Sequence, residues 1–317
     1  MSKKPAWKQQ SERSNVFWIV LLLRLGQLFG RPLARALLPI IVLYFVIFPA
    51  GAQIHSRNYL QRILQRPVRR RDVARHFHCF ASTVLDRLLL FAGREQALEV
   101  EMAPNADFDA LLNRGQGAVL LIAHIGSFDV LRLAAQQRAD RPRLRVLMDL
   151  SRAAQMNAVL KSLNPALLSN IIDTSAYQGA DLMLRIRDEL QAGAVIGIMA
   201  DRLQRPDERS VSVDFLGQPA PFPAFPWLIA SVMQAPVFLG LGLYQGGRRY
   251  CLQFEQLCAG QTPVPRSQRQ AQIQQQVQQY AGRLQHWLQR YPLNWFNFYD
   301  FWAAQSPAPD RSDATAS

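Results

Sequence analysis

One histidine in this chain has a carboxylate five positions further on, and this pair is the best suited of its residues to acid–base chemistry. His124 ends an apolar run over residues 117–123, and Asp129 opens a stretch with helical spacing. An imidazole at a strand end, with a carboxylate to fix its tautomer, is the arrangement of a general base for a hydroxyl. The other histidines have no acid at that spacing: they are His55, His76, His78 and His286.

The turn between the two residues adds a second chemical feature. Gly126 permits a positive φ next to the histidine, and Ser127 is a suitable N-cap for the helix that follows. A strand, a tight turn and a helix N-terminus together present backbone N–H groups that suit a developing oxyanion. The alternative is that His124 is a hydrogen-bonded core residue and Asp129 a helix-start aspartate that favours the helix dipole.

The length and the net charge of the chain limit its domain organisation and the molecules it can bind. The chain has 317 residues, enough for one large α/β domain with an N-terminal appendage or for two domains. Its formal net charge of +13 and pI of about 10.4 indicate an anionic partner, either nucleic acid or a phospholipid surface. Only the charge supports nucleic acid, since zinc-finger spacing and RNP-like motifs are absent, so we expect no nucleic-acid partner.

The cysteines and the missing motifs limit the kinds of chemistry that the chain can carry out. The three cysteines are scattered and form no CxxC, which indicates a reducing compartment and predicts neither a disulfide framework nor a metal site. The sequence also has no dinucleotide GxGxxG, no Walker loop and no GxSxG elbow.

The N-terminal region predicts membrane attachment. Residues 37–52 are uncharged and apolar, and residues 15–23 form a second apolar run. We predict an N-terminal membrane anchor over residues 1–54, as one span or a hairpin, with a buried helix of a soluble protein as the alternative. An arginine-rich stretch follows, which predicts a cytoplasmic side and contact with anionic head groups. Its members are Arg57, Arg62, Arg66, Arg69, Arg70, Arg71 and Arg75.

The body of the chain, residues 55–302, alternates strand and helix patterns. This alternation predicts an α/β fold, with a mostly parallel sheet flanked by helices. The tail over residues 303–317 is rich in Ser, Pro, Ala and Asp and is expected to be disordered. Strands are expected at 98–102, 117–124, 144–148, 170–173, 193–200, 237–244 and 249–256, and helices at 71–91, 108–113, 129–137, 153–163, 180–191, 227–233 and 269–290.

An ordered set of segments carries a family resemblance. Behind the apolar N-terminus, the chain has Ala123-His-Ile-Gly-Ser-Phe-Asp-Val-Leu-Arg132, and later Ile198-Met-Ala-Asp-Arg202. Val213-Asp-Phe-Leu-Gly217, Pro221-Phe-Pro223, Ala235-Pro-Val-Phe238 and the aromatic segment 291–302 follow. Together they resemble the lysophospholipid acyltransferase-like superfamily, in the branch of the late, lauroyl- and myristoyl-type acyltransferases of lipid A biosynthesis and their short bacterial relatives. The Phe-Pro-Glu-Gly block of glycerolipid acyltransferases is missing, which counts against a phosphatidic-acid-forming enzyme.

The resemblance implies a glycerolipid-acyltransferase-like fold and a reaction. A fatty acyl group would pass from a thioester, of acyl carrier protein or CoA, to a hydroxyl of a lipid or glycolipid. His124 would take the hydroxyl proton, and Asp129 would accept from the other ring nitrogen and stabilise the imidazolium. Direct transfer is preferred, with Ser127 as nucleophile the alternative. No cofactor or metal is expected, because a thiolate is a fair leaving group.

Further residues are candidates for substrate binding, beside Gly126 and Ser127 of the turn. Arg152 and Arg202 follow strands at the expected edge of His124 and would bind a phosphate, with Asp201 orienting Arg202. Aromatic side chains would line an acyl-chain groove or meet the membrane surface, with core packing as the alternative. They are Phe222, Phe225, Trp227 and the aromatic residues of 295–302.

These expectations place the protein at the bacterial inner membrane, with its catalytic domain on the cytoplasmic face. The positive charge favours the acidic acyl carrier protein as donor. Two other functions stay open: a thioester or lipid hydrolase that uses the same histidine with water, and a non-enzymatic basic membrane tether.

Overall fold

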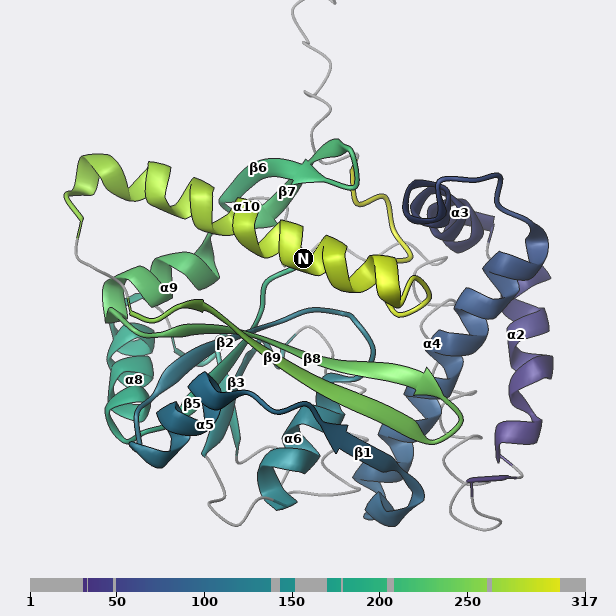
Figure 1. The fold of residues 1–317 in the computed structure, drawn as a ribbon, viewed down its shortest axis with the longest axis horizontal. Coiled ribbons are helices and arrows are strands. Elements are labelled where there is room, and N and C mark those ends of the chain that lie inside the picture. Colours follow the sequence, from purple (N-terminus) through teal and green to yellow (C-terminus); the bar gives the residue numbers. More distant parts are fainter. Residues whose placement is uncertain are drawn as a thin grey trace, which may run out of the picture.

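A seven-stranded sheet forms the centre of the computed structural model, with strand order β1-β9-β8-β2-β5-β3-β4 (Figure 1). The structure describes residues 31–32, 34–47, 50–137, 143–151, 170–177, 179–203, 208–260 and 264–302. The strands of the sheet are β1 (Glu99–Met102), β2 (Ala118–Ile122), β3 (Leu144–Met148), β4 (Ile171–Asp173), β5 (Val195–Met199), β8 (Val237–Gly246) and β9 (Arg249–Cys258).

The sheet is mostly parallel, as predicted, and only the β8–β9 hairpin pairs antiparallel. All residues of β2 are buried. This explains why its sequence is a continuous apolar run rather than an alternating one, since helices cover both faces of a parallel sheet.

Two separate apolar clusters lie on the two faces. Residues 119 and 121 of β2 pack with α10 (Arg266–Arg290) and α9 (Phe225–Met233), whereas residues 118, 120 and 122 pack with α5 (Ala106–Asn113) and α6 (Phe128–Gln137). In Figure 1, α10 crosses one face of the sheet and α5 and α6 lie on the other. Helices α4 (Arg70–Phe91) and α8 (Gly179–Gln191) complete the layers, so most of the predicted helices are present with small shifts at their ends.

The sequence did not predict the ribbon of β6 (Ser210–Phe215) and β7 (Gln218–Pro223), which lies above α10 (Figure 1). Prolines discourage a strand prediction, but Pro219, Pro221 and Pro223 occupy alternate positions opposite β6. Along each strand of an antiparallel pair, every second residue points its N–H group away from the partner strand. The prolines occupy such positions and therefore remove no hydrogen bond between the strands.

The N-terminal helices are shorter than the predicted anchor. Helix α2 (Leu38–Ile47) has 10 residues, a length of about 15 Å, and α3 (Ala50–Leu64) follows it. Within the described residues, no helix combines the length and apolar character needed to cross a membrane. Residues 1–30 of the predicted anchor, the predicted helix at 153–163 and the tail at 303–317 lie outside the described residues.

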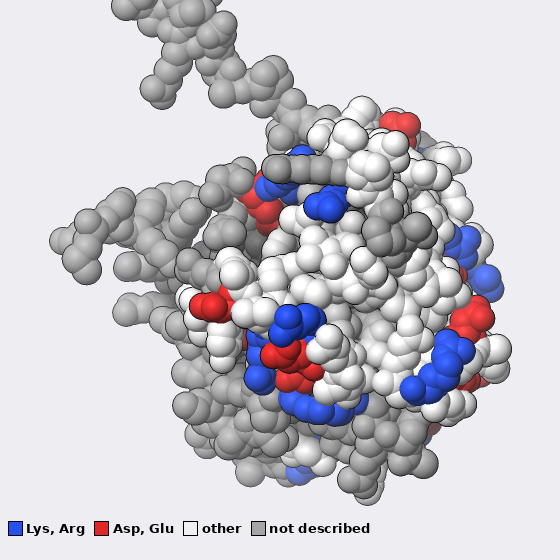
Figure 2. Space-filling model, turned by 90° about the vertical axis from the view of Figure 1, so that its left-hand side faces the viewer, with Lys and Arg blue, Asp and Glu red and all other residues white. Residues whose placement is uncertain are grey.

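One side of α2 is packed and the other faces outward. Leu38 and Ile41 lie in a cluster with Leu88 of α4, whereas Ile40 and Leu43 are 60% and 58% exposed. Elsewhere the surface mixes charges: on the face that carries α8 and α9, Figure 2 shows acidic and basic side chains close together between wide uncharged areas. Outside the grey residues of that view, no broad area carries charge of a single sign.

Candidate active site

The register of two neighbouring parallel strands brings His124 and Asp201 together. In the ladder, Ile122 of β2 lies opposite Met199 of β5, and the chain beyond each strand continues in parallel, with Ala200 N–H donating to the Ile122 carbonyl at 2.9 Å. His124 and Asp201 therefore meet two residues beyond these strand ends. His124 Nδ1 lies 2.8 Å from Asp201 Oδ1.

Asp201 is fully buried and receives hydrogen bonds on both oxygens. Its Oδ2 accepts from the His124 main-chain N–H at 3.0 Å and from the Trp295 indole N–H at 3.1 Å. Burial alone would raise the pKa of Asp201, but electrostatic attraction to the His124 ring when it is protonated, and the hydrogen bonds from His124 and Trp295, outweigh burial, so the pKa lies below its ordinary value. The carboxylate is therefore ionised at neutral pH.

An ionised carboxylate on Nδ1 fixes the tautomer of the histidine. A carboxylate only accepts hydrogen bonds, so Nδ1 carries the proton and Nε2 keeps its lone pair. The His124 side chain is 24% exposed. Among the residues that the structure describes, none hydrogen-bonds Nε2. The pair thus has the geometry of a general base.

The carboxylate predicted for this role, Asp129, lies elsewhere. It is buried in the first turn of α6, where Oδ2 is 2.8 Å from Nε of Arg87 on α4 and Oδ1 is 3.9 Å from a terminal nitrogen of Arg132. The hydrogen bond that His124 was predicted to donate to Asp129 is therefore made to Asp201 instead. The expectation that Asp201 orients Arg202 is corrected too, because Asp201 bonds His124 and Trp295. The signal for Asp201 was its place just after a strand that neighbours β2.

The turn after His124 has the expected backbone but not the expected donors. Gly126 has φ +62°, and a Cβ there would lie 2.0 Å from the Gly242 carbonyl oxygen. Its N–H donates to the Asn294 carbonyl at 2.8 Å, and the Ser127 N–H donates to the Gly242 carbonyl at 2.8 Å. These two N–H groups of the turn that was predicted to stabilise an oxyanion are thus used to attach it to its neighbours. Ser127 is also buried, which does not suit a nucleophile.

The C-terminal aromatic segment, residues 291–302, is attached to the same turn. Phe296 N–H donates to the His124 carbonyl at 2.9 Å, and Trp295 forms a β-bridge with Ile125. The side chain of Asn294 bonds both the N–H and the carbonyl of Tyr244. The segment therefore closes one side of the site with main-chain bonds.

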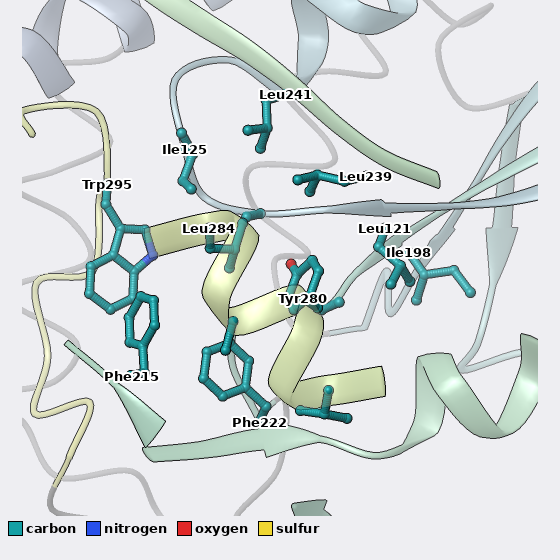
Figure 3. Close-up of a cluster of buried hydrophobic side chains, with 14 of the residues drawn as sticks. Leu121, Ile125, Ile198, Phe215, Phe222, Leu239, Leu241, Tyr280, Leu284 and Trp295 are labelled. Carbon is teal, nitrogen blue, oxygen red and sulfur yellow. The ribbon is translucent and has the colours of Figure 1, made fainter. Parts of the chain in front are cut away.

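Most of the predicted groove aromatics turn out to be core residues. Phe222, Trp227 and Trp295 are buried, and Figure 3 shows the Trp295 ring beside Phe215 in the cluster that α10 covers. Phe225 and Tyr299 are the more exposed of these side chains, at 36% and 38%. Core packing was the alternative for these aromatic residues, and the structure favours it for Phe222, Trp227 and Trp295.

Arg202 is the cation nearest in sequence to the pair. Its guanidinium lies over the ring of Tyr299, 5.9 Å from the ring centre. It follows Asp201 at the strand-end edge, where an anionic substrate group was expected. Arg152, its predicted companion, lies outside the described residues.

Two further features of the described residues bear on the chemistry. No group of His, Cys, Asp and Glu in the described part of the chain is arranged to hold a metal ion. A cavity of about 30 Å³ lies between the sheet and the α5–α6 layer, among apolar side chains that include Leu120 and Leu131. Neither His124 nor Asp201 lines it, so it is separate from the site.

Comparison with known proteins is consistent with this geometry. The family model described as bacterial lipid A biosynthesis acyltransferase matches residues 6–303. The match includes His124, Asp129, Asp201 and the C-terminal aromatic segment. A comparison with curated proteins found no match.

Proposed function

Because the chain belongs to the bacterial lipid A biosynthesis acyltransferase family, we propose that it transfers a fatty acyl group from a thioester to a hydroxyl of a lipid or glycolipid, with His124 as general base. The family membership makes the protein an acyltransferase. The observation that supports this base is the 2.8 Å contact of His124 Nδ1 with the buried Asp201, which leaves Nε2 as the acceptor of a proton.

The proposed reaction is a direct transfer. The acceptor hydroxyl gives its proton to Nε2 of His124 while its oxygen bonds to the thioester carbonyl carbon. The resulting imidazolium is stabilised by the ionised Asp201, which stays in place because three N–H groups hold it. When the carbon–sulfur bond breaks, the thiolate leaves and the imidazolium returns the proton to it. No acyl-enzyme is needed, in agreement with the burial of Ser127.

The donor and the anionic contact follow from charge. The formal net charge of +13 favours an acidic acyl carrier protein over CoA, because complementary charge speeds encounter. Arg202 is the proposed contact for a phosphate of the donor or of the acceptor, since it lies at the same strand-end edge as the base.

Membrane association is part of the proposal. Helix α2 exposes Ile40 and Leu43, and α3 exposes Ile54 at 56%. The arginines of α3 and α4 follow directly in the chain, which suits anionic head groups beside an apolar face. We place the protein at the bacterial inner membrane, with the catalytic domain on its cytoplasmic face.

The proposal is tested with membranes that contain the protein, a labelled acyl thioester and a lipid extract that supplies hydroxyl acceptors. The expected result is a new acylated lipid with the wild type and none with His124→Ala. His286→Ala is the matched control, since His286 is exposed on α10 and is not among the hydrogen-bond partners of His124 or Asp201. Free fatty acid formed at the same rate with and without the extract would identify a hydrolase instead.

The acceptor is identified by mass spectrometry of lipids from cells with and without the gene. A lipid species that gains one acyl chain only in the presence of the wild-type protein, and not with His124→Ala, is the product. Identical lipid profiles under conditions where the protein is present in the membrane would contradict the proposed transfer.

A further inference from the structure

We propose that Trp295 is a positioning residue for the catalytic pair, which holds Asp201 through its indole N–H and is itself held by His76. This inference rests on the proposed role of His124 as general base. It assigns a role to the C-terminal aromatic segment, whose residues lie far from His124 in sequence.

The indole is bound to the oxygen of Asp201 that does not face the His124 ring. Oδ2 accepts from Trp295 Nε1 at 3.1 Å and from His124 N–H at 3.0 Å, while Oδ1 receives Nδ1. A carboxylate can rotate about its terminal bond unless both oxygens are held. Because Asp201 is fully buried, loss of the indole donor would leave this oxygen with one donor fewer and no access to bulk water.

The indole ring is in turn fixed by packing. Trp295 is 1% exposed, and edge-to-face contacts join its ring to Tyr59 and Phe301, each at 4.9 Å between ring centres, and to Phe215 at 5.3 Å. Figure 3 shows Trp295 between Ile125 and Phe215. Aromatic neighbours on several sides leave the indole N–H a single direction, toward Asp201.

A buried histidine holds the main chain of Trp295. His76 Nε2 lies 2.8 Å from the Trp295 carbonyl oxygen, and His76 Nδ1 lies 2.9 Å from Ser56 Oγ. Burial lowers the pKa of His76 to about 4, so the ring is neutral at physiological pH. A carbonyl only accepts, so Nε2 donates to Trp295 and Nδ1 accepts from the Ser56 hydroxyl. Residues of α3 and α4 thus support the site through one aromatic residue.

The experiment replaces the indole N–H and keeps the ring. β-(3-Benzothienyl)alanine at position 295 puts sulfur in place of the N–H with nearly the same shape, and Trp295→Phe is the simpler variant. Trp287→Phe is the matched control, because Trp287 of α10 also donates its indole N–H to a carboxylate, that of Glu255 on β9, at 2.8 Å. Thermal unfolding in detergent confirms that each variant is folded.

We expect kcat to fall about tenfold in both variants at position 295, with KM for the acyl thioester nearly unchanged. The acid limb of the pH profile is expected to move to higher pH. When the Trp295 N–H is lost, more negative charge stays on the Asp201 carboxylate, which then stabilises the imidazolium of His124 more strongly. The imidazolium is therefore expected to lose its proton only at higher pH. The other titratable groups that face Asp201 are Tyr280 and Tyr299, and burial raises the pKa of both, so they stay neutral.

The outcomes separate positioning from packing. Wild-type kcat and pH profile with benzothienylalanine would overturn the proposal, even if Trp295→Phe is impaired, because only packing would then matter. A fall in kcat with an unchanged acid limb would overturn it as well. An active His124→Ala enzyme would instead refute the general base itself, and it is measured in the same assay.

Discussion

Replacement of the two carboxylates, one at a time, tests which of them serves the histidine. In Asp201→Asn, the amide oxygen is held at the position of Oδ2, because two N–H groups donate there. The amide NH₂ then faces Nδ1 of His124, which must accept, so the ring proton moves to Nε2 and the base is lost. In Asp129→Asn, the catalytic pair keeps all its bonds, since Asp129 contacts Arg87 and Arg132 instead.

The magnitudes follow from these contacts. A hydrogen bond to an ionised group contributes about 1.5–3 kcal/mol, and the wrong tautomer adds about 1–2 kcal/mol, so Asp201→Asn is expected to lower kcat about 1,000-fold. Asp129→Asn removes the buried negative charge that faces the half-exposed Arg87 and the more buried Arg132. It is expected to lower the free energy of unfolding by about 1–2 kcal/mol and kcat by less than about tenfold.

Steady-state kinetics on both variants decide the question, with urea unfolding as the measure of stability. The reasoning is refuted if Asp129→Asn loses as much kcat as Asp201→Asn while its unfolding midpoint stays at the wild-type value. Such a result would mean that the acid five residues after the histidine reaches the ring during the reaction.

Three further predictions concern the turn, the buried histidine and the exposed apolar face. Gly126→Ala is expected to lower the free energy of unfolding, measured by urea titration, by about 3 kcal/mol, because φ at Gly126 is +62° and the new Cβ would meet a carbonyl oxygen. The control is Gly93→Ala, where φ is +71° but the space around the Cβ is open, and it is expected to lose only about 1 kcal/mol. Burial lowers the pKa of His76 to about 4 in the folded chain, against an ordinary value of about 6.5, so the unfolded chain takes up the proton first as pH falls. Stability is therefore expected to be constant above about pH 6.5 and to drop by about 3 kcal/mol by pH 4, and urea unfolding at several pH values should find a smaller loss in His76→Gln. The double variant Ile40→Ser, Leu43→Ser is expected to sediment less with anionic vesicles than the wild type, because both side chains face outward. Its thermal unfolding is expected to stay unchanged, and sedimentation equal to that of the wild type would contradict the membrane-facing surface.

The fold was largely predictable because its signals are local. The apolar run of β2 and the periodicity of α4 and α10 each depend on residues that are neighbours in the chain, and the structure confirms these elements. The β6–β7 ribbon was missed because its prolines oppose a strand locally, and only the pairing with β6 makes their positions acceptable.

The partner of His124 was missed for a related reason. A fixed spacing from the histidine detects only acids that are close in the chain, and it selected Asp129. The contact with Asp201 crosses 77 residues and exists because β5 is the sheet neighbour of β2, in a register that sets Ile122 opposite Met199. Strand order is not encoded in any one segment, so spacing alone could not supply it.

The two strand ends nevertheless contain a usable rule. In a parallel pair, residues at equal distances beyond opposed strand ends lie side by side, so a histidine two residues past one strand meets the residue two past its neighbour. Any buried parallel strand followed by Ala-Asp was therefore a candidate partner for Ala-His after β2. The same geometry explains why Trp295 matters: strand ends position the two side chains only approximately, and a third segment that bonds both His124 and Asp201 is what holds them in the geometry a general base requires.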